Sequence, residues 1–488
     1  MNLPMQLIWF RQDLRIHDQT SLWHATQAGQ TVAVVMLSPG QWLLHDDAPI
    51  KIDFYLRQLQ QLKQQLDALN IPLLIETVPL WKDIPDSMLK LCQQFKIEKL
   101  HANIEAGVNE QQRDAQVAAI LYQHQIATEF YLDRTLFPLG NIRNQSNAPY
   151  QVFGAFKKRC YEHLSLSLPS CLPAPEAQPA INTLEFNISE FSTSIPCVQT
   201  FYPDFTAPAS MWTVGEAHAF ALLDEFLDEH VRHYPTERDY PHLQGTSQLS
   251  AYLNMGVLSI RQCVNALFRE QHGQLDFEHT GQQIWLDELL WREFYQHILH
   301  DFPRVSKHLP FRLNTQKVAW RSLADPIVAD DFQAWKQAQT GIPIVDAGMR
   351  QMLATGWMHN RVRMIVAMFL SKNLLIDWRL GEQWFMQHLI DGDLAANNGG
   401  WQWCASTGTD SVPYFRVFNP VSQSQKFDAN GDYIRTWVPE LAGLDAKSIH
   451  APYAKNPNLN LNYPKPVVDL KMSRIRAIEA FKNAQGKI

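Results

Sequence analysis

The segment NNGGWQW, from Asn397 to Trp403, places two asparagines, two glycines and two tryptophans within seven residues. An NNGG sequence by itself favours a tight turn, here one that leads into a core lined by tryptophan. The alternative is a functional site, because amides form hydrogen bonds without adding charge and indole rings stack on other flat groups. Both interpretations stay open on these residues alone.

A second candidate lies in QQIWLDELLWREFYQHIL, residues 282–299. Helical spacing places Glu288, Trp291, Arg292 and Tyr295 on one face, at i, i+3, i+4 and i+7. The face could be solvated surface, but tryptophan is an unusual residue on a wetted face. A carboxylate, an indole and a guanidinium side by side therefore indicate either a surface or a binding face.

Hydroxyl groups gather where two further helices are expected to begin. Thr246, Ser247 and Ser250 precede one helix, and Ser259 precedes the next. Hydroxyls and free backbone N–H groups at a helix N-terminus suit a phosphate or pyrophosphate. Ordinary N-capping by serine is the alternative.

A fourth segment, GWMHNRVRMI, opens a helix with two arginines close together. Arg361 and Arg363 oppose the positive end of the helix dipole, so we expect an anionic partner. Asp391 and Asp393 of LIDGDL are candidates within the chain, which would make a structural salt bridge; a phosphate ligand is the other possibility.

Hydrophobic periodicity predicts the elements that would position these residues. Short apolar or β-branched runs alternate with helical patterns up to residue 132, which predicts βαβ units and a parallel sheet. The GxGxxG fingerprint is absent, so the sheet is not an evident NAD site. We predict an α/β domain over 1–135, a Pro- and Ser-rich linker over 136–210, and a large helical domain over 211–488. The strands are expected at 7–10, 31–37, 72–77, 99–103 and 128–132, and the main helices at 52–69, 214–230, 259–271, 283–300, 345–354, 361–372 and 382–389.

The overall composition fits a folded, two-domain protein of the cytosol. The 488 residues are 46% hydrophobic and 19% charged, with 15 Trp. The sequence contains no run of about 18 apolar residues, so no membrane span is predicted. The first residues lack the pattern of a signal peptide. The six cysteines show no metal-ligand spacing, so we expect reduced thiols, a cytoplasmic location and no metal. A net charge of −7 argues against non-specific coating of nucleic acid but permits a local basic groove.

These motifs resemble the photolyase/cryptochrome family. IWFRQDLRIHD, GTSQLSAYLNMGVLS, ELLWREFY, WMHNRVRMI, DWRLGEQWF, DGDLAANNGGWQWCASTGTDSVPYFRVFNP and KFDANGDYIRTWVPEL carry the likeness, which extends from about residue 5 to beyond 441. It is greatest to bacterial class I cyclobutane pyrimidine dimer photolyases. The resemblance implies a Rossmann-like domain that binds an antenna pigment and an all-α domain that binds FAD.

The resemblance also implies a function. Reduced FAD, excited by blue or near-UV light, would donate an electron to a cyclobutane pyrimidine dimer flipped out of DNA, and the ring would split to two pyrimidines. The residues it assigns to FAD are Tyr234, Thr246, Ser247, Gln248, Leu249, Ser250, Trp285, Glu288, Arg292, Asn360, Arg363, Asp391, Gly392, Asp393 and Asn397. Arg363 would pair with Asp391, and Asn397 would lie at the flavin N5, where an amide could donate without adding charge.

Catalytic and electron-transfer roles follow from the same resemblance. Trp291 and Trp403 would stack on the dimer, and Glu288 would donate to its carbonyl or stabilise charge there, with a raised pKa if buried. Asn360 and Met364 would complete the pocket and mark cyclobutane rather than (6-4) specificity. An electron-hopping chain would run through Trp401, Trp378 and Trp320 to the surface and photoreduce the flavin.

The resemblance places DNA and antenna contacts elsewhere in the chain. DNA would be contacted, mostly through phosphates, by Arg238, Glu288, Trp291, Arg292, Tyr295, Asn360, Arg361, Trp403, Arg416, Gln423 and Lys426. Asn109 and Glu110 match positions of folate-type antennae, so methenyltetrahydrofolate is favoured, with deazaflavin or FMN as alternatives. A polar helix start would explain the same two residues.

Two residues depart from the family pattern, and two other functions compete. Gln248 stands where relatives often have Arg, and Asp287 where Asn is common.

A cryptochrome photoreceptor would use the same FAD and tryptophans without repair, but the repair-type Asn397, Glu288 and Met364, and the 47 residues after Leu441, count against it. A dark flavin oxidoreductase lacks a recognisable nicotinamide site. We expect a monomer.

Overall fold

The computed structural model describes residues 4–181, 193–206, 208 and 212–484. Its contacts divide the chain into two compact units. The first comprises Met1–Tyr150, Gly154–Val231 and Ser247–Pro303, and the second Gln151–Phe153, Arg232–Thr246 and Arg304–Ile488. Each unit is described by itself.

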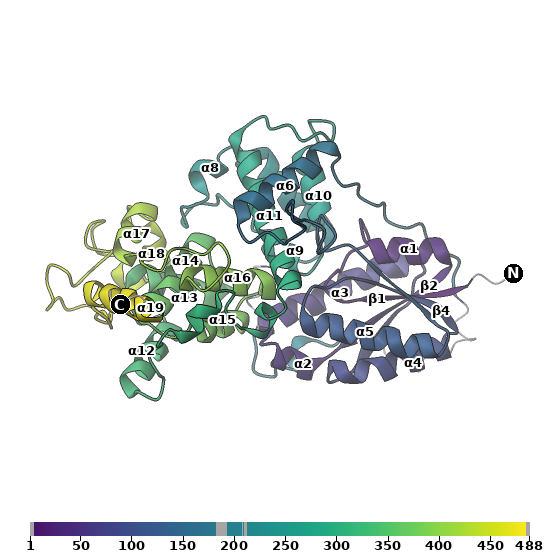
Figure 1. Cartoon of the computed structure of the whole chain (residues 1–488), viewed down its shortest axis with the longest axis horizontal. Coiled ribbons are helices and arrows are strands. Elements are labelled where there is room, and N and C mark those ends of the chain that lie inside the picture. The colour runs from purple at the N-terminus through teal and green to yellow at the C-terminus, as the bar shows by residue number, and fades with distance from the viewer. Residues whose placement is uncertain (1–3, 182–192, 207, 209–211, 485–488) are drawn as a thin grey trace. The chain divides into compact units, whose positions relative to one another are not determined.

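The first unit is built on a five-stranded parallel sheet (Figure 1). The strands are β1 (Met5–Phe10), β2 (Gln30–Leu37), β3 (Leu73–Thr77), β4 (Ile97–Asn103) and β5 (Ala127–Tyr131). Their order is β3-β2-β1-β4-β5, and every neighbouring pair is parallel. All five strands coincide with the runs expected from the sequence, so that prediction is confirmed.

Right-handed crossovers determine which helices cover each face of this sheet. The chain moves outward from β1 to β2 and β3 through α1 (Thr20–Ala28), α2 (Pro39–Leu44) and α3 (Pro49–Ala68). It then reverses direction towards β4 and β5 through η1 (Trp81–Asp83), α4 (Ile84–Gln94) and α5 (Val108–Gln123). The reversal places α4 and α5 on the opposite face, where they share one buried cluster with Leu7, Trp9 and Val34.

Helices beyond the sheet complete the first unit. They are α6 (Phe153–Leu166), η3 (Val198–Thr200), α7 (Glu216–Glu225), the π-helical turn η4 (Phe226–His230), α9 (Ser250–Asn254), α10 (Ile260–Leu267) and α11 (Thr280–Asp301). The stretch expected as a linker therefore contains α6, which the Pro- and Ser-rich composition did not predict. Its first residue, Phe153, is assigned to the second unit.

In the described part of the second unit, the regular elements are helices joined by irregular segments. Its elements are α8 (Tyr234–Glu237), η5 (Val305–Lys307), η6 (Leu313–Lys317), α12 (Pro326–Lys336), α13 (Pro343–Thr355), α14 (Asn360–Met368), the π-helical turn η7 (Phe369–Asn373), α15 (Trp378–Met386), α16 (Leu394–Ala405), α17 (Pro420–Phe427), α18 (Asp432–Trp437), η8 (Pro439–Leu441) and α19 (Leu470–Ala484). Apolar residues of α13 to α16 form its main core. Among the described residues, no helix combines the length and the hydropathy needed to cross a bilayer.

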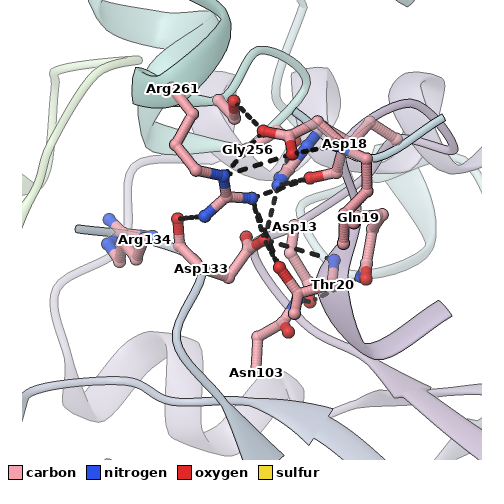
Figure 2. Close-up of polar contacts among 12 residues, drawn as sticks. Asp13, Asp18, Gln19, Thr20, Asn103, Asp133, Arg134, Gly256 and Arg261 are labelled. Atoms are coloured by element: carbon pink, nitrogen blue, oxygen red, sulfur yellow. Dashed lines mark hydrogen bonds and ion pairs between the residues drawn. The ribbon is translucent and has the colours of Figure 1, made fainter. Parts of the chain in front are cut away.

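A buried network of charges holds α10 against the sheet (Figure 2). Arg261 of α10 donates through Nε to Asp18 Oδ2 at 2.9 Å and through Nη2 to Asp133 Oδ1 at 2.9 Å. Arg15 donates to the same Asp133 oxygen at 2.6 Å and to the carbonyl of Gly256 at 2.9 Å. The two arginines hold the pKa of Asp133 well below its usual range, despite the burial that opposes ionisation.

Gly256 permits this close approach. Its φ is +62°, and a Cβ there would lie 2.5 Å from the carbonyl oxygen of Gln12 and 2.6 Å from Cα of Asp13. Only glycine adopts this conformation readily and leaves room for the backbone that follows β1.

Arg261→Ala is expected to lower the free energy of unfolding by about 3–5 kcal/mol, because it leaves Asp18 buried without its cation. Arg269→Ala is a matched control, since its ion pair with Asp224 is exposed and should contribute less than about 1 kcal/mol. Denaturant unfolding of both variants measures the difference. Equal effects would mean that the buried network does not stabilise the first unit.

Candidate active site

One face of α11 carries the four residues that helical spacing placed together. Glu288, Trp291, Arg292 and Tyr295 are each partly exposed in the first unit, whereas Trp285 on the same helix is buried. The Trp291 ring lies 5.7 Å from that of Tyr295, centroid to centroid. The helix therefore presents a carboxylate beside two large aromatic rings.

Arg292 is fixed by two backbone carbonyls. Its Nη1 donates to Arg134 O at 2.9 Å, and its Nη2 donates to Leu253 O at 3.4 Å. This guanidinium thus joins α11 to the segment after β5 and to α9. Asp287, the residue that departs from the family pattern, accepts from Lys157 Nζ at 2.9 Å and from Tyr161 Oη at 2.5 Å, so it ties α6 to α11.

The hydroxyl-rich segment divides between the units. Tyr234 and Thr246 belong to the second unit, while Ser247, Gln248, Leu249 and Ser250 belong to the first. Gln248 has a φ of +51°, a strained value for a residue with a side chain. Ser259 forms a complete capping box with Gln262 at the start of α10, so the capping interpretation is confirmed for this serine.

The two arginines of α14 both have carboxylate partners in the second unit. Arg363 donates through Nη2 to both oxygens of Asp391 at 3.0 and 2.9 Å, the pairing that the resemblance implied. Arg361 donates through Nη2 to Asp239 Oδ1 at 2.7 Å, a partner that the sequence did not suggest. An anionic partner within the chain is thus confirmed for each.

The NNGGWQW segment is helical, so the tight turn expected from its glycines is wrong. It lies inside α16, which Asp393 begins by accepting a hydrogen bond from Ala396 N at 2.8 Å. Packing against α15 overrides the low helix propensity of the two glycines. A helix places the asparagines and tryptophans at defined angles around one axis.

Asn397 is oriented by α15. Its Nδ2 donates to the backbone carbonyl of Glu382 at 3.0 Å, and Asn398 Nδ2 donates to Glu382 Oε1 at 2.8 Å. The other Glu382 oxygen lies 3.0 Å from His308 Nδ1. The bond to the Glu382 carbonyl uses one of the two N–H groups of the Asn397 amide, so the side chain can still donate through the other N–H, as the resemblance implied, or accept through Oδ1.

The three tryptophans expected to carry electrons grade from buried to partly exposed. Trp401 and Trp378 are 2% and 1% exposed, and Trp320 is half-buried. Trp401 packs on α15, where a Cβ on Gly381 would lie 2.2 Å from the Trp401 ring. The centroids of the Trp401 and Phe385 rings are 4.9 Å apart. All three tryptophans contact the same apolar core.

Other expected site residues of the second unit lie at its surface or beside that core. Met364 and Trp403 are partly buried and pack against it, whereas Asn360 is exposed. Arg238 lies over the buried Tyr234 ring at 5.2 Å. Gln423 is partly buried on α17.

The expected antenna residues belong to a small polar and aromatic cluster at the start of α5. Asn109 Nδ2 lies 3.0 Å from His45 Nε2, and the His45 ring meets Trp81 edge-on at 4.7 Å. Burial and the nearby Glu105 raise the pKa of Glu110 to about 7. Sequence reasoning missed His45 and Trp81, because they come from two separate segments with no spacing that relates them to Asn109.

The point where the strand order reverses is nearly closed. Ligands of open α/β sheets often bind there, outside the carboxyl ends of the strands, here β1 and β4. A cavity of about 20 Å³ remains between Arg11, Asn103 and Arg292. It holds about one water molecule, and a ligand pocket needs at least about 300 Å³.

The residues of the second unit fit FAD chemically. They supply the amide of Asn397, the ion pair of Arg363 with Asp391, and the indole of Trp401, whose buried Nε1 has no hydrogen-bond partner among the described residues. Bound FAD, once reduced, would supply an electron when light excites it. The chain's own residues would orient the flavin, exclude water from it and deliver electrons to it.

Gly381→Ala is expected to destabilise the protein by about 1–3 kcal/mol, because the added methyl group overlaps Trp401. Gly400→Ala in α16 is the control, since a Cβ there meets nothing within 4 Å and should stabilise the helix by up to about 1 kcal/mol. Thermal unfolding and near-UV circular dichroism test this, and an unperturbed Trp401 signal in Gly381→Ala would refute the packing argument.

Comparisons with known proteins agree with these features. Residues 6–179 match the family model DNA photolyase, and residues 285–483 match the FAD binding domain of DNA photolyase. The chain is 41% identical to the deoxyribodipyrimidine photo-lyase of Salmonella typhimurium over 99% of both chains. It superposes with a TM-score of 0.83 on a class III photolyase from Agrobacterium tumefaciens, at 30% identity, covering 100% of this chain and 98% of that one. A cryptochrome from Synechocystis gives a TM-score of 0.84 at 26% identity, covering 98% and 99%. The chain belongs to the DNA photolyase family.

Proposed function

We propose that this chain is a deoxyribodipyrimidine photo-lyase, which uses light and reduced FAD to split cyclobutane pyrimidine dimers in DNA. The structural observation that carries the proposal is the partly exposed face of α11, where Glu288 lies among Trp291 and Tyr295. Photolyases are among the enzymes that extrude their target nucleotide from the duplex. Aromatic faces bind such bases whatever the flanking sequence, at about 1–3 kcal/mol per base.

Glu288, when protonated, is proposed to donate a hydrogen bond to the dimer carbonyl, where negative charge develops. Asn360, Met364 and Trp403 of the second unit are proposed to contact the lesion. The amide of Asn397, oriented by its bond to the Glu382 carbonyl, would lie at the flavin N5, where it could donate through its second N–H. Substrate phosphates would be bound by Arg238, Arg361 and Gln423 together with residues of α11, without reading of sequence. Local cations of this kind are compatible with a net charge of −7.

Methenyltetrahydrofolate is the proposed antenna, bound near Asn109 and Glu110. The cluster of His45 and Trp81 beside Asn109 supports it, because it combines hydrogen-bonding groups with a flat aromatic ring. Deazaflavin and FMN remain the alternatives to folate. We infer a cytoplasmic location, because all six cysteines are free thiols, and a monomer, because the family resemblance suggests one.

Repair of a duplex oligonucleotide with one thymine dimer tests the main proposal. Pre-reduced holoenzyme is expected to restore both thymines under blue light and not in the dark. Glu288→Ala should retain FAD yet lose most of the repair quantum yield, whereas Glu270→Ala, which removes an exposed carboxylate of the same unit outside α11, should not. Repair of the (6-4) product instead, or of neither lesion by photoreducible holoenzyme, would favour another lesion or a cryptochrome-type photoreceptor.

Antenna binding is expected to weaken as the pH falls through about 7. Glu110 has a pKa of about 7, so it loses its negative charge below that pH and then accepts hydrogen bonds from pterin N–H groups less well. Folate fluorescence titrations between pH 6 and 8.5 measure this, and Glu110→Gln should bind weakly with no such pH dependence. The same pH dependence in Glu110→Gln would exclude Glu110 as the group responsible.

A further inference from the structure

The π-helical turn η7 places a lysine where no solvent reaches it. Lys372 is fully buried, and its Nζ donates to Ser406 Oγ at 2.7 Å and to Tyr414 O at 3.4 Å. The same Nζ lies 3.9 Å from the centre of the Phe481 ring. Every one of these partners is neutral, and no carboxylate of the described residues forms an ion pair with Lys372. A buried ammonium without a counter-ion is unusual, because burial of an unpaired charge is costly.

The Phe481 ring links this amine to the outermost tryptophan of the proposed electron-transfer chain. Trp320 meets Phe481 edge-on with centroids 5.7 Å apart, and both pack in one small apolar cluster. The two contacts with Phe481 place Lys372 Nζ within roughly 10 Å of the Trp320 ring, which is close enough for a charge in a poorly solvated region to act on it.

The charged and titratable groups around this cluster do not cancel a charge on Lys372. Cys404 of α16 is a thiol whose pKa burial raises to about 12, so it stays neutral. Arg476 of α19 donates to the carbonyl of Asn373 at 2.6 Å and adds a second positive charge. Tyr414 contributes its carbonyl and a ring stacked on Phe481.

The carboxylate of Asp331, which acts on Arg476, is already engaged. Asp331 of α12 pairs with Arg321 at 2.8 Å, and Arg321 also donates to the carbonyl of Leu374. The residue after Trp320 is thus Arg321, whose charge is balanced by Asp331. The charges of Lys372 and Arg476 near Trp320 have no such balance among the described residues. Loss of an electron from Trp320 creates a positive charge in an already cationic region.

We propose that Lys372 controls electron transfer from Trp320 during photoreduction: its ammonium form destabilises the Trp320 radical cation, and its neutral amine form permits that radical cation to persist. This inference rests on the proposed electron-transfer chain. One electron leaves Trp320 for Trp378 and passes through Trp401 to the flavin. The Trp320 radical cation then regains that electron from the flavin, or it takes one electron from a small thiol in solution, which becomes a thiyl radical and releases its proton to water.

Burial lowers the pKa of Lys372 to about 7, so its charge changes close to neutral pH. Holoenzyme with oxidised FAD and a small thiol is therefore expected to show a several-fold rise in photoreduction yield as the pH increases from 6 to 8.5.

Lys372→Met, similar in length and neutral, should give the high yield throughout. Lys372→Arg, which keeps its charge, should give the low yield throughout. Ser406→Ala removes an acceptor from the ammonium and should move the midpoint to lower pH. An undiminished rise with pH in Lys372→Met would overturn the proposal.

Thermal unfolding provides a measurement without light. The folded-state pKa lies below the unfolded value near 10.4, so between the two the unfolded chain binds a proton that the folded chain does not. The contribution of Lys372 to stability thus rises with pH from about 7 to 10. Lys372→Met should raise Tm by several degrees at pH 6 and by less at pH 10. A Tm difference between Lys372→Met and the unaltered protein that does not change with pH would contradict titration of Lys372.

Trp320→Phe separates failure of this inference from failure of the proposed electron path. It is expected to abolish thiol-dependent photoreduction at every pH while repair by pre-reduced holoenzyme remains. Intact photoreduction in Trp320→Phe would remove Trp320 from the path and refute the role of Lys372 with it. Loss in Trp320→Phe together with an undiminished pH dependence in Lys372→Met would refute the role of Lys372 alone.

Discussion

The pairing of Arg261 with Asp18 and Asp133 is the constraint on which the first unit depends. Two carboxylates without solvent around them would be protonated or would unfold the region, so their cations must be held in place. Arg261 brings α10 to the loop after β1 and to the end of β5. The next residue after Asp133 is Arg134, whose carbonyl accepts from Arg292 of α11. Arg134 thus connects the charge network to α11, the helix that carries Glu288.

The second unit depends in a comparable way on Glu382. Its backbone carbonyl orients Asn397, and its carboxylate accepts from Asn398 and meets His308. The preceding residue, Gly381, has no side chain to separate α15 from the Trp401 ring. Two consecutive residues of α15 therefore locate both the amide and the indole proposed to serve the flavin, which explains why α16 is helical despite its glycines.

Elements of the fold could be predicted from the sequence where the local hydrophobic pattern was strong. The five strands were predictable because buried parallel strands are continuous apolar runs between turn residues. The turn at NNGG was predicted wrongly, since the helix there is decided by packing between α15 and α16, which no local propensity records. The helix α6 was missed because Pro-rich flanks dominated the composition of that stretch.

Among site residues, spacing within one helix was informative and contacts between segments were not. The common face of Glu288, Trp291 and Tyr295 followed from helical periodicity alone. The Arg361–Asp239 pair joins residues 122 positions apart and carries no local signal. The pairing of Arg363 with Asp391 came from the family resemblance, because spacing left the phosphate alternative open.

Three cations of this protein, the buried Arg261 and Lys372 and the partly exposed Arg292, differ in how they are held. The difference separates structural groups from a group that can respond to pH. Arg261 is matched by two carboxylates, and Arg292 is fixed by carbonyls. An arginine stays charged at any physiological pH, so neither can respond to proton concentration. Lys372 has the one side chain of the three that loses its proton readily when buried, and its hydrogen-bond partners are neutral. A lysine at this position keeps the outer tryptophan beside a charge that can be removed, whereas an arginine would make the opposition to electron loss permanent.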